Sequence, residues 1–153
     1  MRTAVSAWTG GAPRLADLFA GIGALSLGWP GKLALYESDA PSVAAADATA
    51  RRIGGNRVQT HRRDLFRNPL AGKELDAFDA VLLDPPRAGA AAQSAELASS
   101  RVPRIVYASC DPGSFARDAR VLQEGGYRLE KLMPIDQFLW SAHLELIALF
   151  GRR

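Results

Sequence analysis

The stretch "RIVYASCDPGSFARDARVLQEGG", residues 104–126, contains one complete strand-to-helix unit. Its first six residues, Arg104 to Ser109, are mostly apolar and include β-branched and aromatic side chains, which indicates a buried strand. Asp111 is a good N-cap and Pro112 a good first helical residue, so a helix is predicted from here to about Glu124. The two glycines that follow end the helix.

The same alternation of short apolar runs and helical segments occupies the rest of the chain. Strands are predicted at residues 14–19, 32–37, 57–61 and 77–84, and helices at about 41–52 and 90–100. The last two runs, 127–136 and 143–150, have no helix between them. Strands that alternate with helices predict an α/β fold with a doubly wound, mostly parallel sheet of seven strands. The short final connection predicts an antiparallel pair at one edge.

Length and composition indicate a single soluble domain. The chain has 153 residues, of which 48% are hydrophobic, and it contains no apolar run long enough to span a membrane. Its start has no signal-peptide pattern, so we expect a cytoplasmic protein. A net charge of +3 permits a phosphate-rich partner. The single cysteine excludes an internal disulfide and a cysteine-ligated cluster, and His61 and His143 are not at zinc spacing, so we expect no metal.

Ligands of such sheets bind at the carboxyl ends of the strands, so the residues there are candidates for a site. After the first strand, Gly21 and Gly23 allow a tight turn and a close approach to a ligand. The second strand ends at Glu37, which can accept hydrogen bonds from both hydroxyls of a ribose. Asp64, after the third strand, can receive an adenine amino group or cap a turn.

The later strand ends carry a different set of groups. Asp84 opens the segment Asp-Pro-Pro-Arg, a stiff loop on which a flat base can dock, and Arg87 offers a planar fork for a phosphate or a base edge. Cys110 follows the fifth strand, where it is either packing or a nucleophile. His143 and Glu145 point to one face of the last strand, which is either an edge-strand surface or part of a site.

Together these strand ends resemble one family, the S-adenosylmethionine-dependent RNA (uracil-5-)-methyltransferases that act on tRNA or 23S rRNA. "DLFAGIGALSL" resembles the family's cofactor loop, "VLLDPPRAG" its D-P-[PA]-R-x-G motif, "IVYASCDPGSFARD" its S-C-N-P-x-T-x-x-R-D motif, and "DQFLWSAHLELIALF" its D-x-F-P-x-T-x-H-x-E motif. The resemblance extends from Leu15 to Phe150. It implies a Rossmann-like class I methyltransferase fold that methylates C5 of a uridine in tRNA or rRNA.

The resemblance also implies a role for each motif residue. Cys110 is expected to be the nucleophile and Glu145 the general base. Substrate-binding residues are expected at Asp84, Arg87 and His143. S-adenosylmethionine is expected to contact Asp17, Phe19, Gly21, Gly23, Glu37, Asp64 and Asp84.

The chemistry of uracil requires such a set of groups. C5 of uracil is a poor nucleophile toward a methyl sulfonium. A thiolate that adds to C6 converts the ring to an enolate with negative charge at C5, which can then attack the methyl group. A base must afterwards remove the proton from C5 so that the cysteine can leave. Cys110 lies just before a predicted helix, and the positive end of a helix favours a thiolate there.

The chain departs from the family pattern in several places. Asp111 replaces the usual asparagine, Leu139 replaces the proline of F-P-x-T, and Ala24 replaces a common asparagine. Only residues 1–14 precede the first strand, so we expect residues 1–153 to form one catalytic domain without the family's N-terminal RNA-binding barrel and iron–sulfur domain. The chain would then be either an isolated fragment of the catalytic domain or a minimal stand-alone relative, to which a separate chain could supply RNA binding. The sequence does not indicate an oligomeric state.

Two alternative functions remain open at this stage. A degenerate domain of the same fold could bind RNA or a protein partner without catalysis. A methyltransferase that uses Asp-Pro-Pro to methylate an amino group of a base would give Cys110 no role, and such enzymes usually carry an aromatic residue where this chain has Arg87.

Overall fold

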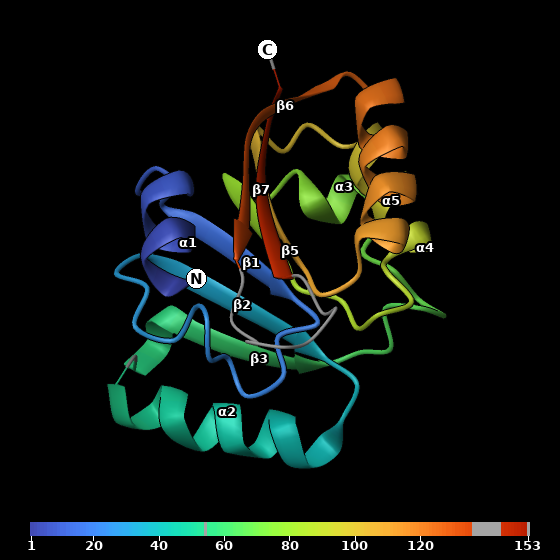
Figure 1. Ribbon diagram of the computed structural model, residues 1–153. Helices are drawn as coiled ribbons and strands as arrows, with labels where there is room; N and C mark the ends of the chain where they lie inside the picture. The colour runs from blue at the N-terminus through green and yellow to red at the C-terminus, as the bar shows by residue number, and fades with distance from the viewer. Residues whose placement is uncertain (54, 136–144, 153) are drawn as a thin grey trace.

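The computed structural model describes residues 1–53, 55–135 and 145–152. Its centre is a seven-stranded sheet in the order β3-β2-β1-β4-β5-β7-β6 (Figure 1). The strands are β1 (Arg14–Leu18), β2 (Lys32–Glu37), β3 (Val58–Arg62), β4 (Ala80–Leu83), β5 (Arg104–Ser109), β6 (Tyr127–Ile135) and β7 (Glu145–Arg152). The prediction of a doubly wound, mostly parallel sheet of seven strands is therefore confirmed.

The antiparallel edge is also confirmed, and the structure places its two strands. β1 to β5 pair in parallel, whereas β7 runs antiparallel between β5 and β6. Because β7 is inserted there, its first residue, Glu145, lies at the edge of the sheet where the parallel strands end. β6 is the outermost strand, and its charged, exposed residues Arg128, Glu130 and Lys131 discourage further strand pairing.

Helices cover the two faces of the sheet. They are α1 (Arg2–Trp8), α2 (Ala40–Ile53), α3 (Gly72–Leu75), α4 (Ala91–Ser99) and α5 (Pro112–Glu124), with a 3₁₀ turn at Gly55–Arg57. Along β4 the side chains alternate, so that Val81 and Leu83 pack in the cluster under α3, α4 and α5. Ala80 and Leu82 pack in the cluster that contains residues of α1 and α2. β4 thus contributes to both apolar cores, and Figure 1 shows the helices on the two sides of the sheet.

The structure differs from the predicted elements in three places. Helix α1 was not predicted, because Val5 is the one residue that it buries fully. The predicted strand at 77–84 begins three residues later, since the turn that ends α3 extends to Phe78, whose N–H bonds the carbonyl of Leu75 (2.9 Å). Helix α3 was not predicted either, whereas the connection from β1 to β2 forms consecutive turns over residues 21–28, in agreement with the predicted glycine turn.

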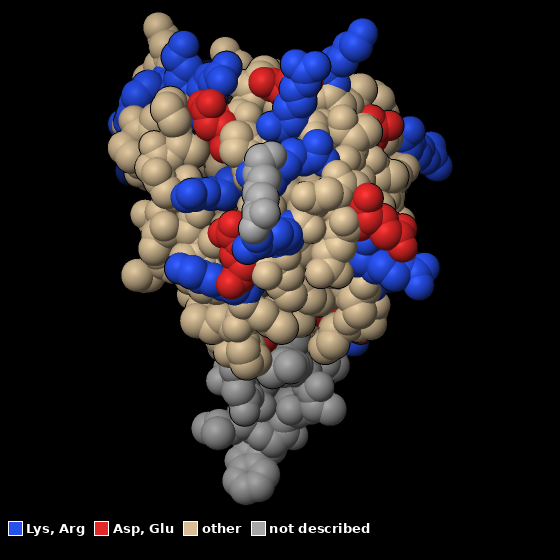
Figure 2. All heavy atoms as spheres, turned by 90° about the horizontal axis from the view of Figure 1, so that it is seen from above, with Lys and Arg blue, Asp and Glu red and all other residues tan. Residues whose placement is uncertain are grey.

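Charge is distributed unevenly between the two ends of the strands. Arg104 and Arg128 both pair in register with Gly151, next to Arg152. Figure 2 shows Lys and Arg side chains gathered on the face seen from above, with fewer Asp and Glu among them. The opposite ends of the strands carry the carboxyl groups described below. Within the described ranges no helix is long and apolar enough to cross a membrane.

Candidate active site at the carboxyl ends of the strands

The loop after β1 adopts a left-handed backbone at three positions. Phe19, Gly21 and Gly23 have φ values of 62°, 54° and 78°. Left-handed backbone is costly for a residue with a Cβ atom, so two of the three positions are glycines. The backbone N–H of Ala20 bonds the carbonyl of Tyr36 (3.1 Å), which folds the loop against the end of β2.

Glu37, at the end of β2, is bound to this loop. Its Oε2 accepts a hydrogen bond from the N–H of Gly21 (3.0 Å). Its Oε1 accepts from the N–H groups of Ser38 (2.6 Å) and Asp39 (2.8 Å) and from the Ser38 hydroxyl (3.1 Å). Burial acts to raise the pKa of Glu37, but these donors outweigh it and the pKa lies below its ordinary value. Glu37 is therefore a stable carboxylate whose Oε2 has a single donor among the described bonds.

Asp17 lies below the same loop and is buried, with 1% of its surface exposed. Its Oδ2 accepts a short hydrogen bond from the Ser26 hydroxyl, and its Oδ1 has no hydrogen-bond partner among the described residues. Burial raises the pKa of Asp17 to about 7, although the bond from Ser26 lowers it. The negative charges of Asp84 and Glu37 raise this pKa further. Asp17 thus titrates close to neutral pH.

A cavity of about 340 Å³ opens at the end of β4 and β5. It is lined by Met1, Ala24, Leu25, Asp84, Ala108, Ser109, Cys110 and Glu145. Three predicted site residues from three different strand ends, Asp84, Cys110 and Glu145, therefore meet in one cavity. Burial raises the pKa of Asp84 to about 6, and the nearby charge of Glu145 adds to this effect. Two carboxyl groups that repel each other in a cavity favour a cationic ligand or a shared proton.

Cys110 connects β5 to α5 as the sequence predicts. Asp111 caps α5, because its side chain accepts a hydrogen bond from the N–H of Ser114 (2.8 Å). This bond is the main cause that lowers the pKa of Asp111, and the charge of Arg87 lowers it further. Arg87, exposed on the loop after β4, is therefore close enough to attract the capping carboxylate beside Cys110. The thiol itself is partly exposed and not oxidised to a disulfide.

Other predicted site residues have local roles in the structure. Asp64 caps a turn, since its Oδ1 accepts from the N–H groups of Phe66 (3.0 Å) and Arg67 (3.3 Å). The sequence left open whether Asp64 caps a turn or receives adenine; the structure shows the cap, which uses Oδ1, and binding of adenine stays a prediction. The Phe19 ring packs on the ring of Phe66, with 5.2 Å between centroids. His143 lies outside the described residues.

Comparison with known proteins identifies the family. A family model described as tRNA (uracil-5-)-methyltransferase matches residues 56–153. The chain belongs to the tRNA (uracil-5-)-methyltransferase family. This match contains the loop after β4, Cys110 and Glu145, so the three side chains that share the cavity lie within the family's own segment.

Relatives of this methyltransferase domain come from bacteria and archaea. It is 50% identical over 99% of its length to an uncharacterized RNA methyltransferase of Brucella suis, and covers 37% of that protein. It is 39% identical over 99% of its length to the 23S rRNA (uracil(1939)-C(5))-methyltransferase RlmD of Chromohalobacter salexigens, and covers 32% of it. The chain therefore spans about a third of the length of these curated relatives.

A solved structure supports the same assignment. The tRNA (uracil-54, C5)-methyltransferase of Pyrococcus abyssi, in complex with S-adenosyl-L-homocysteine, superposes with a TM-score of 0.80 at 26% identity. The superposition covers 97% of this chain and 36% of that protein. The predicted class I methyltransferase fold is thereby confirmed.

Sequence reasoning missed several residues near the candidate site. Met1 lines the cavity because α1 brings it there, and no motif signals this. Ile22 and Phe66 are apolar and exposed, at 56% and 50%. Ile22 lies between the two glycines of the loop, and this position in the sequence could have indicated that it lies near the site. Phe66 had none, because its place beside Phe19 depends on the tertiary fold.

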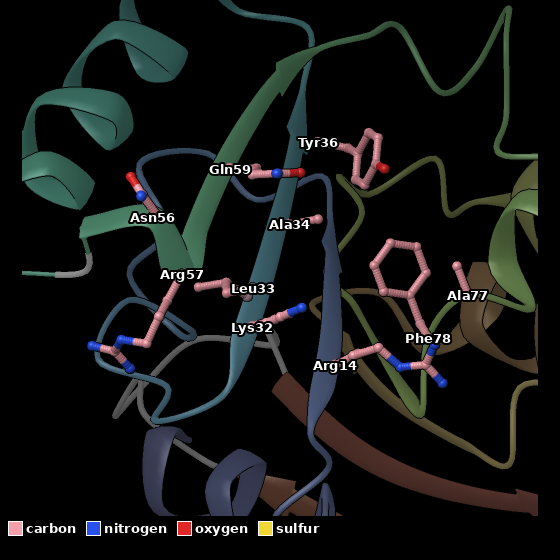
Figure 3. Close-up of a pocket in the computed structure, with 10 residues that line it drawn as sticks. All are labelled: Arg14, Lys32, Leu33, Ala34, Tyr36, Asn56, Arg57, Gln59, Ala77 and Phe78. Carbon is pink, nitrogen blue, oxygen red and sulfur yellow. The ribbon is translucent and has the colours of Figure 1, made fainter.

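A second cavity, of about 310 Å³, lies on the face of β1, β2 and β3 (Figure 3). Two of the charged residues that line it already form bonds with other residues of the chain. Arg14 forms an ion pair with Asp79 (2.9 Å), and Arg57 donates to the carbonyls of Trp29 (3.1 Å) and Pro30 (2.7 Å). None of the described predicted site residues lines this cavity, and no group of described His, Cys, Asp and Glu could hold a metal ion.

Proposed function

We propose that residues 1–153 form a catalytic domain that transfers a methyl group from S-adenosylmethionine to C5 of a uridine in RNA, with Cys110 as nucleophile and Glu145 as general base. The observation that carries this proposal is the cavity in which Cys110, Asp84 and Glu145 meet. Membership of the uracil-5-methyltransferase family supports the reaction class, and the relatives whose names state a substrate act on tRNA or 23S rRNA.

The residues beside the cavity fit a cationic methyl donor. S-adenosylmethionine supplies a methyl group bound to a positively charged sulfur. Asp84 and Glu145 repel each other there, and a positive charge between them would lower the pKa of Asp84 from about 6 toward its ordinary value. Gly21 has open space on the side where a Cβ atom would lie, and Oε2 of Glu37 can accept a bond from a ribose hydroxyl.

Each step of the reaction uses a group in this cavity. The Cys110 thiolate forms a bond to C6 of uracil, and the electron pair of the C5–C6 double bond moves onto the ring as an enolate. C5 then forms a bond to the methyl carbon while the bond from that carbon to the sulfur of the donor breaks, and S-adenosyl-L-homocysteine is the leaving group. Glu145 removes the remaining proton from C5, the C5–C6 double bond forms again, and the bond between C6 and sulfur breaks to release the thiolate.

Asp84 and Arg87 would hold the target base. Asp84 lines the same cavity as Cys110, where its carboxylate can accept a hydrogen bond from an N–H group of the base. Arg87 lies on the same stiff loop, where its guanidinium can reach a phosphate next to the flipped base. His143 belongs to the family motif and is assigned to the same substrate site.

A covalent trap tests the proposal. In 5-fluorouridine RNA the fluorine at C5 replaces the proton that the base must remove, so the methylated adduct with Cys110 accumulates. We expect the wild-type protein with S-adenosylmethionine to gain the mass of RNA plus one methyl group, and Cys110→Ala to gain none. Calorimetry first establishes that both proteins bind S-adenosyl-L-homocysteine. A wild type that binds the cofactor product but forms no adduct with any tRNA or rRNA fragment contradicts the nucleophile assignment.

Glu145 is tested with ordinary uridine RNA. Glu145→Gln is expected to accumulate a covalent RNA complex, because the amide cannot accept the C5 proton. Glu124→Gln is the matched control, since this carboxylate lies exposed at the end of α5. A Glu145→Gln protein that turns over at the wild-type rate would exclude Glu145 as the base.

A further inference from the structure

Asp118 on α5 is fully buried and joins three segments of the chain. Its Oδ2 accepts hydrogen bonds from the Tyr107 hydroxyl on β5 (2.7 Å) and from the N–H of Ala90 (2.6 Å). Its Oδ1 accepts from Nε of Arg117 (2.9 Å). A buried carboxylate with donors from a strand, a loop and a helix fixes the distances among all three.

Arg117 binds the loop after β4 one residue before Gly89, whereas Asp118 binds it one residue after Gly89. Its Nη2 donates to the carbonyl of Ala88 (3.0 Å), whereas Asp118 holds the N–H of Ala90. The two neighbouring side chains also form an ion pair (2.8 Å). Arg117 and Asp118 therefore hold the backbone on both sides of Gly89, and this pair with its bonds is here named the α5 clamp.

Gly89 permits this close contact. Its φ is +76°, and a Cβ atom there would lie 2.5 Å from Nη2 of Arg117, 2.7 Å from Oδ2 of Asp118 and 2.9 Å from Cβ of Ser114. A larger residue would push the loop off the helix. The glycine that ends "DPPRAG" thus contacts the Arg-Asp pair that ends "SCDPGSFARD".

The α5 clamp connects the two motifs that carry the reacting groups. The loop that it holds begins at Asp84 and contains Arg87, and α5 begins two residues after Cys110. Tyr107, the third partner, lies three residues before Cys110 on β5. The clamp itself does not line the cavity.

We propose that Arg117 and Asp118 are positioning residues, which set Asp84 and Arg87 at the distance from Cys110 that the addition to uracil requires. This inference rests on the proposed function. The reaction slows when reacting groups are displaced by a fraction of an ångström, whereas the loop after β1 and Glu37 at the end of β2 lie outside the clamp and keep their positions. The clamp should therefore affect kcat and adduct formation but not the affinity for S-adenosyl-L-homocysteine, whose sulfur carries no positive charge for Asp84 to attract.

The principal test is Arg117→Gln, because this side chain is half exposed and its loss leaves no cavity in the core. We expect adduct formation with 5-fluorouridine RNA to slow by about 10- to 100-fold per folded molecule, with the affinity for S-adenosyl-L-homocysteine unchanged. Arg117→Lys keeps the positive charge but cannot donate to both Asp118 and the carbonyl of Ala88 as the guanidinium does. It should therefore recover only part of the rate of adduct formation. Arg120→Gln, exposed on the same helix, is the matched control.

Hydrogen exchange separates this inference from the proposed function. The N–H of Ala90 is expected to exchange about tenfold faster in Arg117→Gln and in Asp118→Asn than in the wild type, whether or not any protein methylates RNA. An inactive wild type with a protected Ala90 would contradict the proposed function alone. Wild-type adduct rates in Arg117→Gln, or unchanged exchange at Ala90 in both variants, would overturn the positioning role.

Discussion

The carboxylate of Glu37 accepts a hydrogen bond from the backbone N–H of Gly21 at 3.0 Å. Glu37 ends β2 and Gly21 belongs to the loop after β1, and the two strands are neighbours in the sheet. The sequence presents them as two separate cofactor-binding features. The structure joins them, so the side chain that is expected to bind a ribose also sets the conformation of the glycine loop.

Glu37→Gln is predicted to destabilise this loop. The amide keeps one acceptor oxygen, while its NH₂ group faces N–H donors that the carboxylate accepted. We expect the free energy of unfolding at pH 7 to fall by about 1–3 kcal/mol. Because the pKa of Glu37 is lowered in the folded chain, its contribution is present above its ordinary pKa and lost as the pH falls through the folded value.

Urea denaturation at pH 7 and at acidic pH measures this effect. The difference between the wild type and Glu37→Gln should shrink as the pH falls, and Glu124→Gln should match the wild type at both values. Equal stability of Glu37→Gln and the wild type at pH 7 would show that the bond to Gly21 contributes little.

The raised pKa of Asp17 predicts that the free energy of unfolding declines toward alkaline pH. Its pKa is raised from 3.8 to about 7 in the folded chain, so the folded state binds a proton that the unfolded state releases. This contribution is fully present below the unfolded pKa and is lost as the pH rises through about 7. The side chain of Asp17→Asn cannot ionise. As the pH rises from 5 to 8, the free energy of unfolding of this variant should increase relative to that of the wild type by on the order of 3 kcal/mol.

Thermal unfolding at several pH values, without cofactor, checks this prediction. Ser26→Ala is a useful companion, because it removes the hydrogen bond that lowers the pKa of Asp17. It should steepen the decline of stability above neutral pH. A constant stability difference between Asp17→Asn and the wild type across this range would contradict a titrating Asp17.

The arrangement of strands was predictable because it follows from local patterns. Apolar runs, the Asp111 cap and the glycines after α5 mark the elements, and parallel strands bring their carboxyl ends to one edge. Cys110, Asp84 and Glu145 were therefore expected together, and the cavity contains all three. Helix α1 was missed because its one fully buried residue, Val5, makes no periodic pattern.

The hydrogen-bond partners of the site carboxylates were not predictable. The cap that Asp64 forms depends on whether the N–H of Phe66 faces its Oδ1, which residue spacing does not decide. The unpaired Oδ1 of Asp17 and the donors around Glu37 likewise depend on the backbone path of the loops. Residue spacing limits which side chains can meet, but loop conformation decides which atoms do.

Two glycines of the loop after β1 offer a matched pair of substitutions. A Cβ atom on Gly23, whose φ is +78°, would lie 2.7 Å from Cγ and 2.8 Å from Cδ1 of Leu27. A Cβ atom on Gly21 would have no described neighbouring atom within 4 Å. Gly21→Ala is expected to lose about 1 kcal/mol of stability, from backbone strain. Gly23→Ala adds overpacking of roughly 1–3 kcal/mol. Chemical denaturation of the two variants measures the difference, and equal losses would contradict the close contact with Leu27.

Phe66 is predicted to stack on the adenine of the cofactor. It is 50% exposed, and its ring packs at 5.2 Å from the ring of Phe19, so that it stands beside the loop after β1. Stacking of a base on an aromatic ring contributes about 1–3 kcal/mol, so Phe66→Ala should weaken binding of S-adenosyl-L-homocysteine by roughly tenfold or more. Ile53→Ala is the control, since Ile53 is equally exposed, at 50%, but lies at the end of α2. Calorimetry measures both affinities, and an equal effect of the two substitutions would exclude Phe66 from the cofactor site.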